Sequence, residues 1–154
     1  MDPKTKLSPH FSLGELIYSS KAVELGIDNT PPPEVLDRLI IVCCRILEPV
    51  REHYGVSFSP NSGYRCHDLN KAIGGSENSQ HMIGQAVDFE VPGVSNYDLA
   101  LWISKNLEFD QLILERYTPG NASSGWVHCS IISGQNRRMV MTMNGAFTKH
   151  GLIA

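Results

Sequence analysis

The sequence lacks the features that mark nucleic-acid-binding and membrane-spanning proteins. Lys and Arg number 13 against 16 Asp and Glu, which gives a formal net charge of −3 and no basic footprint for a nucleic acid. The longest apolar stretch, Leu39 to Leu47, is interrupted by Arg45 and is too short to span a bilayer. The remaining composition is that of an ordinary globular protein, and 154 residues predict one domain over positions 1–154.

Cysteine is also scarce, and its spacing excludes a disulfide framework. The chain has four cysteines, none in a Cys-x-x-Cys pair, and two of them are adjacent: Cys43, Cys44, Cys66 and Cys129. This pattern is typical of free thiols in a reducing compartment. A cysteine hydrolase using Cys66 or Cys129 stays open as an alternative, although Cys129 is expected to face the core.

Two short segments supply a set of possible metal ligands. The segment His-Met-Ile-Gly-Gln-Ala-Val-Asp runs from His81 to Asp88, and Gly-Trp-Val-His ends at His128. A catalytic zinc takes three protein ligands and keeps its fourth position for water, whereas a structural zinc normally takes four, usually with cysteine. Two imidazoles and one carboxylate therefore predict a hydrolytic site with one zinc ion per chain.

The spacing of these ligands restricts the local structure. Residues seven apart on one helix are separated by about 10 Å of rise, whereas zinc ligands each lie about 2 Å from the metal. Because His81 and Asp88 therefore cannot share a straight helix, Gly84 is expected to turn the chain between them. Polarity then alternates through residues 86–91, which places Asp88 on a strand face opposite the core. The same alternation places His128 on the open face of a second strand.

The rest of the chain predicts an α+β fold, a small antiparallel sheet packed against helices. Capping residues and apolar periodicity predict helices over 12–25 (starting at the Ser12-x-x-Glu15 capping box), 35–50 (kinked or ended by Pro49), 67–73 and 95–106. Besides the strand at 86–91, strands are expected over 56–59, 109–116, 126–132 (the strand of His128) and, at the edge of the sheet, 137–143.

The same segments resemble a known family. Ser79-Gln80-His81-x-x-Gly84-x-Ala86-x-Asp88 followed by Trp126-x-His128 resembles the zinc D-alanyl-D-alanine carboxypeptidase-like peptidases of peptidoglycan. Ser62-Gly63-Tyr64-Arg65 with Asn70 is similar to the segment that precedes the first ligand there. Phe11-Ser12-Leu13-Gly14-Glu15-Leu16 resembles the opening of phage-encoded members, and the similarity runs from about His10 to Ser130.

The resemblance implies a fold, an activity and a cofactor. The expected fold is that of the DD-peptidase/hedgehog-like zinc peptidases, with zinc bound by His81, Asp88 and His128. The expected activity is a hydrolase, a metallopeptidase that cleaves stem peptides or cross-links of the bacterial cell wall as a carboxypeptidase or an endopeptidase, as a bacteriophage endolysin does. The other histidines are expected to be structural or exposed: His10, His53, His67 and His150.

Three polar residues near the ligands are candidates for substrate binding. Arg65 follows a glycine-containing turn, and its guanidinium suits a substrate carboxylate or a developing oxyanion. The resemblance implies this role, and the alternative is a surface salt bridge. Ser79 and Gln80 are expected to orient the substrate or a ligand, with a plain role in the turn as the alternative.

The general base is where the sequence departs from the family pattern. Many members of the broader family carry an acidic residue three positions before the last histidine, and here that residue is Gly125. Glu115 is the substitute: if it pairs with Trp126 across the hairpin, it shares the face of His128 and flanks the metal. Asp110 and Glu90 stay open as alternatives, and Glu90 is also a possible support for a ligand.

The departure at Gly125 keeps a second class of function open. This is a non-catalytic zinc-containing protein that binds the wall or forms part of a virion. The N-terminal residues lack an apolar segment, so a protein made in the cytoplasm without a signal peptide is expected. It would act on the bacterial cell wall after release or as a virion component. The expected partner is a peptidoglycan peptide, with no nucleic acid, no membrane insertion and a monomeric state.

Overall fold

The computed structural model describes residues 1–153 and shows an α+β fold built on a five-stranded sheet. The strands follow the order β1-β3-β2-β4-β5, and neighbours are antiparallel except β2 and β4, which are parallel. Their bounds are β1 Ala86–Phe89, β2 Gln111–Glu115, β3 Trp126–Ser130, β4 Met139–Asn144 and β5 Phe147–His150. The predicted fold class, a mostly antiparallel sheet with helices, is confirmed.

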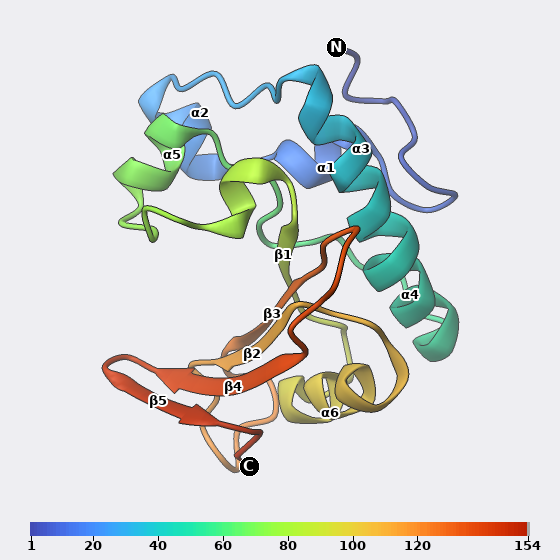
Figure 1. The fold of residues 1–154 in the computed structure, drawn as a ribbon, viewed down its shortest axis with the longest axis vertical. Helices are drawn as coiled ribbons and strands as arrows, with labels where there is room; N and C mark the ends of the chain where they lie inside the picture. Colours follow the sequence, from blue (N-terminus) through green and yellow to red (C-terminus); the bar gives the residue numbers. More distant parts are fainter. Residues whose placement is uncertain (154) are drawn as a thin grey trace.

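The helices divide between two regions of the molecule (Figure 1). In this view α1, α2 and α5 lie above the sheet, α3 runs from there down one side of the molecule towards α4, and α6 packs against β2 and β3. Their bounds are α1 Leu13–Ile17, α2 Ser20–Leu25, α3 Pro33–Val42, α4 Glu48–Tyr54, α5 His67–Ala72 and α6 Asn96–Asn106. A π-helical segment, η1 (Cys43–Leu47), joins α3 to α4, and a short 3₁₀ helix, η2 (Gln80–Ile83), precedes β1.

The sheet has one face in the core and one face open, as the alternation predicts. Val87 and Phe89 of β1, and Val127 and Cys129 of β3, are fully buried in one cluster with apolar side chains of the helices. The intervening side chains point to the other face, where residues of β1, β2 and β3 line a cleft. This arrangement leaves the open face of the central strands available for polar chemistry.

One helix prediction was wrong, and one of the two outcomes expected at Pro49 is excluded. The single helix expected over 12–25 is two helices, because the chain is extended at Tyr18 and Ser19 begins α2 by accepting a hydrogen bond from the Ala22 N–H. Pro49 does not end the second helix, which runs on to Tyr54. The π-helical turn of η1 precedes the proline, and such a bulge offers room for a residue that lacks an amide hydrogen.

Two strand predictions also need correction, and one strand was not predicted. No strand forms over 56–59, a segment without regular structure. The strand expected over 137–143 is β4, but it lies inside the sheet and not at its edge, because β5 pairs with its far side. The sequence analysis missed β5, in which every residue is exposed and which therefore shows no apolar alternation. Within residues 1–153, no helix combines the length and apolar character needed to cross a bilayer.

Candidate metal centre

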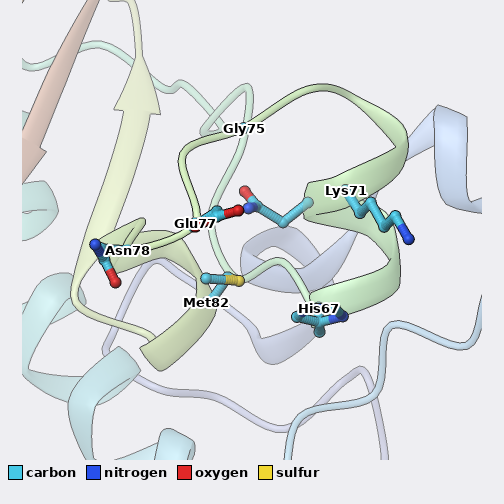
Figure 2. A pocket seen from close by; sticks show the side chains of 7 residues that line it. His67, Lys71, Gly75, Glu77, Asn78 and Met82 are labelled. Carbon is cyan, nitrogen blue, oxygen red and sulfur yellow. The ribbon is translucent and has the colours of Figure 1, made fainter.

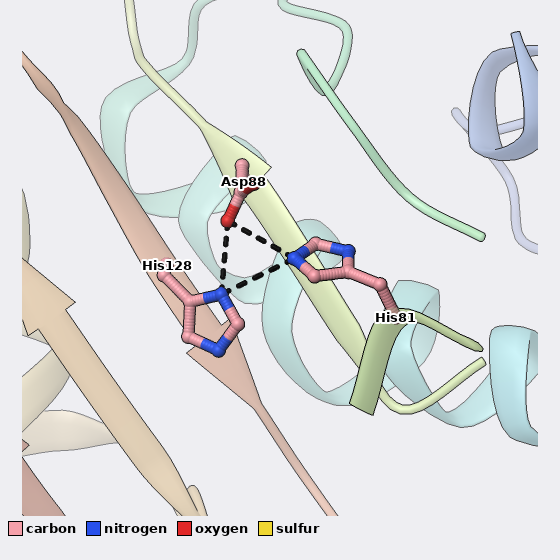
Figure 3. Close-up of side chains that lie close together, drawn as sticks. All are labelled: His81, Asp88 and His128. Atoms are coloured by element: carbon pink, nitrogen blue, oxygen red, sulfur yellow. Dashed lines mark hydrogen bonds and ion pairs between the residues drawn. The ribbon is translucent and has the colours of Figure 1, made fainter. Parts of the chain in front are cut away.

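Three side chains from separate elements meet at one point on the open face (Figure 3). His81 comes from η2, Asp88 from β1 and His128 from β3, where Asp88 and His128 are direct partners across the two strands. Asp88 Oδ1 lies 2.9 Å from His128 Nδ1 and 3.3 Å from His81 Nε2. The two imidazole nitrogens are 3.3 Å apart. The predicted ligand set is thus assembled in space.

These distances fit a zinc ion. Ligand atoms about 2.0–2.1 Å from a tetrahedral zinc lie about 3.3 Å from one another. The three atoms of this site are 2.9–3.3 Å apart, so a single ion could contact all of them with little movement. Two nitrogens and one carboxylate oxygen form the donor set of a catalytic zinc, whose fourth position is open.

The backbone around His81 fixes which nitrogen faces the other ligands. His81 Nδ1 donates a hydrogen bond of 2.7 Å to the Gly63 carbonyl, so Nε2 of the neutral ring carries the lone pair. A side chain at position 63 would place its Cβ 2.3 Å from the Leu16 carbonyl oxygen, so glycine is needed here. Gly84 has a φ of +77° and turns the chain from η2 into β1, as predicted.

The local electrostatics favour the protonation states that bind a metal. Burial lowers the pKa of His81, although the nearby Asp88 carboxylate opposes this shift. Burial also works against ionisation of Asp88, but the two histidines outweigh it and hold the pKa of Asp88 well below its usual range. A neutral imidazole and an ionised carboxylate are the forms that coordinate zinc.

The ligands lie in a cleft with a volume of about 560 Å³. The cleft walls include every residue proposed from the sequence to act on substrate: Arg65, Ser79, Gln80 and Glu115. A neighbouring hollow of about 580 Å³ between α5 and η2 is lined by His67, Lys71, Glu77 and Met82 among others (Figure 2). The two share Gly75 and Asn78, so the hollow adjoins the metal cleft.

The register of the β2–β3 hairpin is the one assumed when Glu115 was predicted to be the general base. Glu115 pairs with Trp126 and Ile113 pairs with His128, so Glu115 shares the open face of β3 with His128. Burial, followed by the charge of Asp88, raises the pKa of Glu115, whereas the nearby Arg65 lowers it. The structure therefore brings Glu115 into the metal cleft as a partly desolvated carboxylate, and its catalytic role stays a prediction.

Position 125 has a structural reason for glycine. Gly125 has a φ of +71°, and a Cβ there would lie 2.0 Å from the Glu115 carbonyl oxygen. Its own carbonyl accepts a hydrogen bond from Asn96 Nδ2 at 3.0 Å. An acidic residue at this position would collide with the end of β2, so the departure from the broader family pattern follows from the close approach of two backbone segments.

The two alternative carboxylates have other partners and do not line the cleft. Asp110 accepts two short hydrogen bonds from Arg137, from Nη2 at 2.7 Å and from Nε at 3.1 Å. Glu90 accepts hydrogen bonds from the side chains of Asn61 and Asn96 and lies in a separate hollow. Glu90 therefore supports Asn61 in a loop and Asn96 at the start of α6, and it makes no hydrogen bond to a ligand among residues 1–153.

Arg65 lies in the cleft with unused donors. Its Nη2 donates to Ser79 Oγ at 3.3 Å, and its Nε is buried without a partner among residues 1–153. Burial lowers the pKa of Arg65, and the charges of Asp88 and Glu115 oppose this shift. The surface salt bridge considered as an alternative is not formed within the described chain.

Ser79 and Gln80 both have structural contacts. Ser79 Oγ caps η2 by accepting from the His81 N–H at 3.2 Å, so it positions the first ligand. Gln80 Nε2 donates to Asp110 Oδ2 at 3.1 Å, and its Oε1 is buried without a partner in the described chain. These contacts agree with the turn role, and a contact of either residue with the substrate stays a prediction.

The cysteines do not contribute to this site. Cys129 is fully buried on the core face, opposite His128 as predicted, and burial raises the pKa of its thiol. Cys66 caps α5 and is not part of the cleft wall. A thiolate nucleophile at either position has no support from this geometry.

The sequence analysis missed several residues of the cleft wall. They include Gln111 and Ile113 from β2, Arg137 just before β4, and Met143 at its end. The alternation along β2 could have indicated Gln111 and Ile113, which share the face of Glu115. No local sequence pattern indicates that Arg137 lies in the cleft. It is brought there by the parallel pairing of β2 with β4, which joins segments far apart in the sequence.

Comparison with known proteins identifies the family. The family model described as Peptidase M15 matches residues 9–130, a segment that contains His81, Asp88 and His128 together with Arg65 and Glu115. Among curated proteins, none matches the chain. The match covers most of the sequence, and the protein belongs to the peptidase M15 family, whose members are zinc-dependent peptidases.

Proposed function

We propose that this protein is a zinc hydrolase that cleaves peptide bonds in the stem peptides or cross-links of peptidoglycan. The observation that carries the proposal is the convergence of His81, Asp88 and His128 at zinc-ligand spacing beside Glu115 in one cleft. Family membership supports a peptide as the substrate. The peptidoglycan part of the proposal rests on the sequence resemblance to D-alanyl-D-alanine carboxypeptidase-like enzymes.

Each polar group of the cleft has a part in the proposed reaction. A zinc ion held by the three ligands would polarise the scissile carbonyl and lower the pKa of water to about 7. Glu115 accepts the proton of the attacking water and returns it to the leaving amine. Its position on the His128 face and its partly buried carboxylate suit this transfer. Ser79 and the Gly63 carbonyl hold His81 in its ligand orientation.

Arg65 acts on the substrate in this proposal. Its guanidinium is planar, partly buried and largely without partners, so it can donate two parallel hydrogen bonds to a carboxylate or stabilise the oxyanion. A carboxypeptidase would use it for the terminal carboxylate, and an endopeptidase for the oxyanion alone.

Release of new amino groups from purified peptidoglycan tests the proposal. We expect zinc-loaded protein to release them, and chelator-treated protein to stop until zinc is restored. Asp88→Ala should be inactive, whereas Glu90→Gln serves as the matched carboxylate control outside the cleft. Equal release by Asp88→Ala and the unmodified chain would contradict the proposal.

One second function has a specific observation in its favour. Because Gly125 replaces the acidic residue of the broader family pattern, a zinc-containing protein that binds the wall without cleaving it is the alternative. It would hold zinc and bind peptidoglycan but release no amines.

The opening segment that resembles phage-encoded members leads us to propose that the protein reaches the wall after release at lysis or as a virion component.

A further inference from the structure

A second guanidinium faces the metal cleft from outside the segment that the family model matches. Arg137 lies between β3 and β4, beyond the matched residues 9–130, and it forms part of the same cleft wall as the ligands and Arg65. The cleft therefore contains two arginines that approach from opposite halves of the sequence. Arg65 donates a hydrogen bond to Ser79, whereas Arg137 is paired with the carboxylate of Asp110.

Arg137 is held in place by a buried carboxylate. Asp110, whose side chain is 3% exposed, accepts from Nη2 at 2.7 Å, from Nε at 3.1 Å and from the Arg137 backbone N–H at 2.9 Å. Such a two-pronged pair fixes the plane of the guanidinium. Asp110 is fixed in turn by Gln80, the residue before ligand His81, which donates to the same carboxylate at 3.1 Å.

The orientation leaves part of the guanidinium free. The Arg137 side chain is 54% exposed, and Nη1 has no partner among residues 1–153. An arginine at a surface normally loses side-chain entropy when it binds a ligand, but this one is already ordered by Asp110. A fixed, half-exposed donor group in a substrate cleft is suited to an oxygen acceptor that the substrate presents at a constant position.

We propose that Arg137 is a specificity-determining residue that binds a carboxylate of the substrate, distinct from the group held by Arg65. The inference rests on the proposed function in its carboxypeptidase form, in which Arg65 binds the terminal carboxylate, and it names the substrate class: a peptide that carries two carboxylates. A stem pentapeptide such as Ala-γ-D-Glu-Lys-D-Ala-D-Ala has two, one at the D-glutamyl residue and one at the C-terminus. The two cleft arginines match that number.

Binding of three synthetic peptides separates this role from catalysis. The probes are this pentapeptide and its two mono-amides, one amidated at the D-glutamyl carboxylate and one at the C-terminus. Dissociation constants are measured by calorimetry on the zinc-loaded Glu115→Gln protein, which slows turnover. Loss of one charge-assisted hydrogen bond costs about tenfold or more in affinity. We therefore expect the free pentapeptide to bind about tenfold more tightly than each mono-amide.

Substitutions then assign each preference to one arginine. Each substitution is added to the Glu115→Gln protein. Arg137→Gln should abolish the preference for one of the two carboxylates and keep the preference for the other carboxylate. Arg65→Lys should weaken that second preference. The matched control is Arg138→Gln, because Arg138 is 46% exposed, pairs with Glu108 and does not line the cleft. It should keep both preferences.

Several outcomes would overturn the inference. It is wrong if the parent protein binds acid and amide equally, if Arg137→Gln keeps both preferences within twofold, or if Arg138→Gln loses as much as Arg137→Gln. Those results leave the proposed function standing as long as the unmodified chain releases amines in a chelator-sensitive manner. Absence of binding to all three peptides, together with absence of amine release, would contradict both.

Discussion

At the scale of single residues, the site depends on a few side chains whose positions are fixed by backbone contacts. The imidazole of His81 is oriented by a carbonyl, and Glu115 is carried to the His128 face by the hairpin register. Substitutions at these positions should therefore affect chemistry more than folding, because both side chains line the cleft and neither belongs to the apolar core.

Glu115→Gln tests the proposed base. Removal of a general base typically costs about 100- to 10,000-fold in rate. We expect a loss in that range with zinc content and thermal midpoint close to the unmodified chain, measured by amine release, metal analysis and calorimetry. Asp110→Asn and Glu90→Gln should cost less activity. If Glu115→Gln stays near full activity while one of the other two is inactive, the base must be reassigned.

Arg65→Lys tests the substrate role of the first cleft arginine. The change keeps the charge but removes the planar fork that can bind a carboxylate with two hydrogen bonds. We expect kcat/KM to fall about tenfold or more, in line with loss of a charge-assisted hydrogen bond. Thermal midpoint and zinc content should not move. Parallel losses of stability and activity would instead show that Arg65 is structural.

At the scale of elements, the close approach of the loop before β3 to the end of β2 excludes a side chain at position 125. Gly125→Ala must strain a positive φ and displace the Glu115 backbone, whose carbonyl oxygen would lie 2.0 Å from the new Cβ. Gly120→Ala, in the same loop, has a φ of +87° but nothing within 4 Å of the new Cβ. It is therefore a control for the strain alone.

The two alanine variants should differ in stability. Backbone strain costs about 1–3 kcal/mol for either variant, and overpacking adds about 1–3 kcal/mol for Gly125→Ala. Urea unfolding should thus show a larger loss of unfolding free energy for Gly125→Ala, accompanied by reduced activity because Glu115 moves. Equal losses for the two variants would contradict the steric explanation for glycine at position 125.

The sequence predicted those elements whose residues show a local pattern. Alternation in residues 86–91 and 126–131 placed Asp88 and His128 on the open face, and the assumed pairing of Glu115 with Trp126 is the observed one. The sequence did not predict the parallel pairing of β2 with β4 or the exposed strand β5, because neither produces a local pattern of apolar residues. The Asp110–Arg137 pair was missed for the same reason: its partners are 27 residues apart.

At the scale of the whole molecule, folding and metal binding are expected to be coupled. The ligands come from η2, β1 and β3, so the complete set exists only when the sheet and the N-terminal half are assembled. A ligand that binds the folded state alone raises the free energy of unfolding. Zinc should therefore stabilise the whole fold and not a single loop.

Metal analysis tests this coupling. We expect about one zinc per chain, lost largely in His81→Ala and Asp88→Ala, and a lower thermal midpoint after chelation that zinc restores. His67→Ala is the control, since His67 is exposed and lies outside the ligand cluster. Full zinc occupancy in both ligand variants would show that the metal lies elsewhere.

The central claim is that the cleft hydrolyses peptide bonds of peptidoglycan with zinc, and mass analysis of digested peptidoglycan tests it most directly. The account predicts new fragments whose masses correspond to hydrolysis of one kind of peptide bond. They should be absent with chelator and with Glu115→Gln, and should return when zinc is added back to the unmodified chain. Fragments that persist unchanged in the presence of chelator, or intact peptidoglycan after incubation with fully zinc-loaded protein, would contradict it.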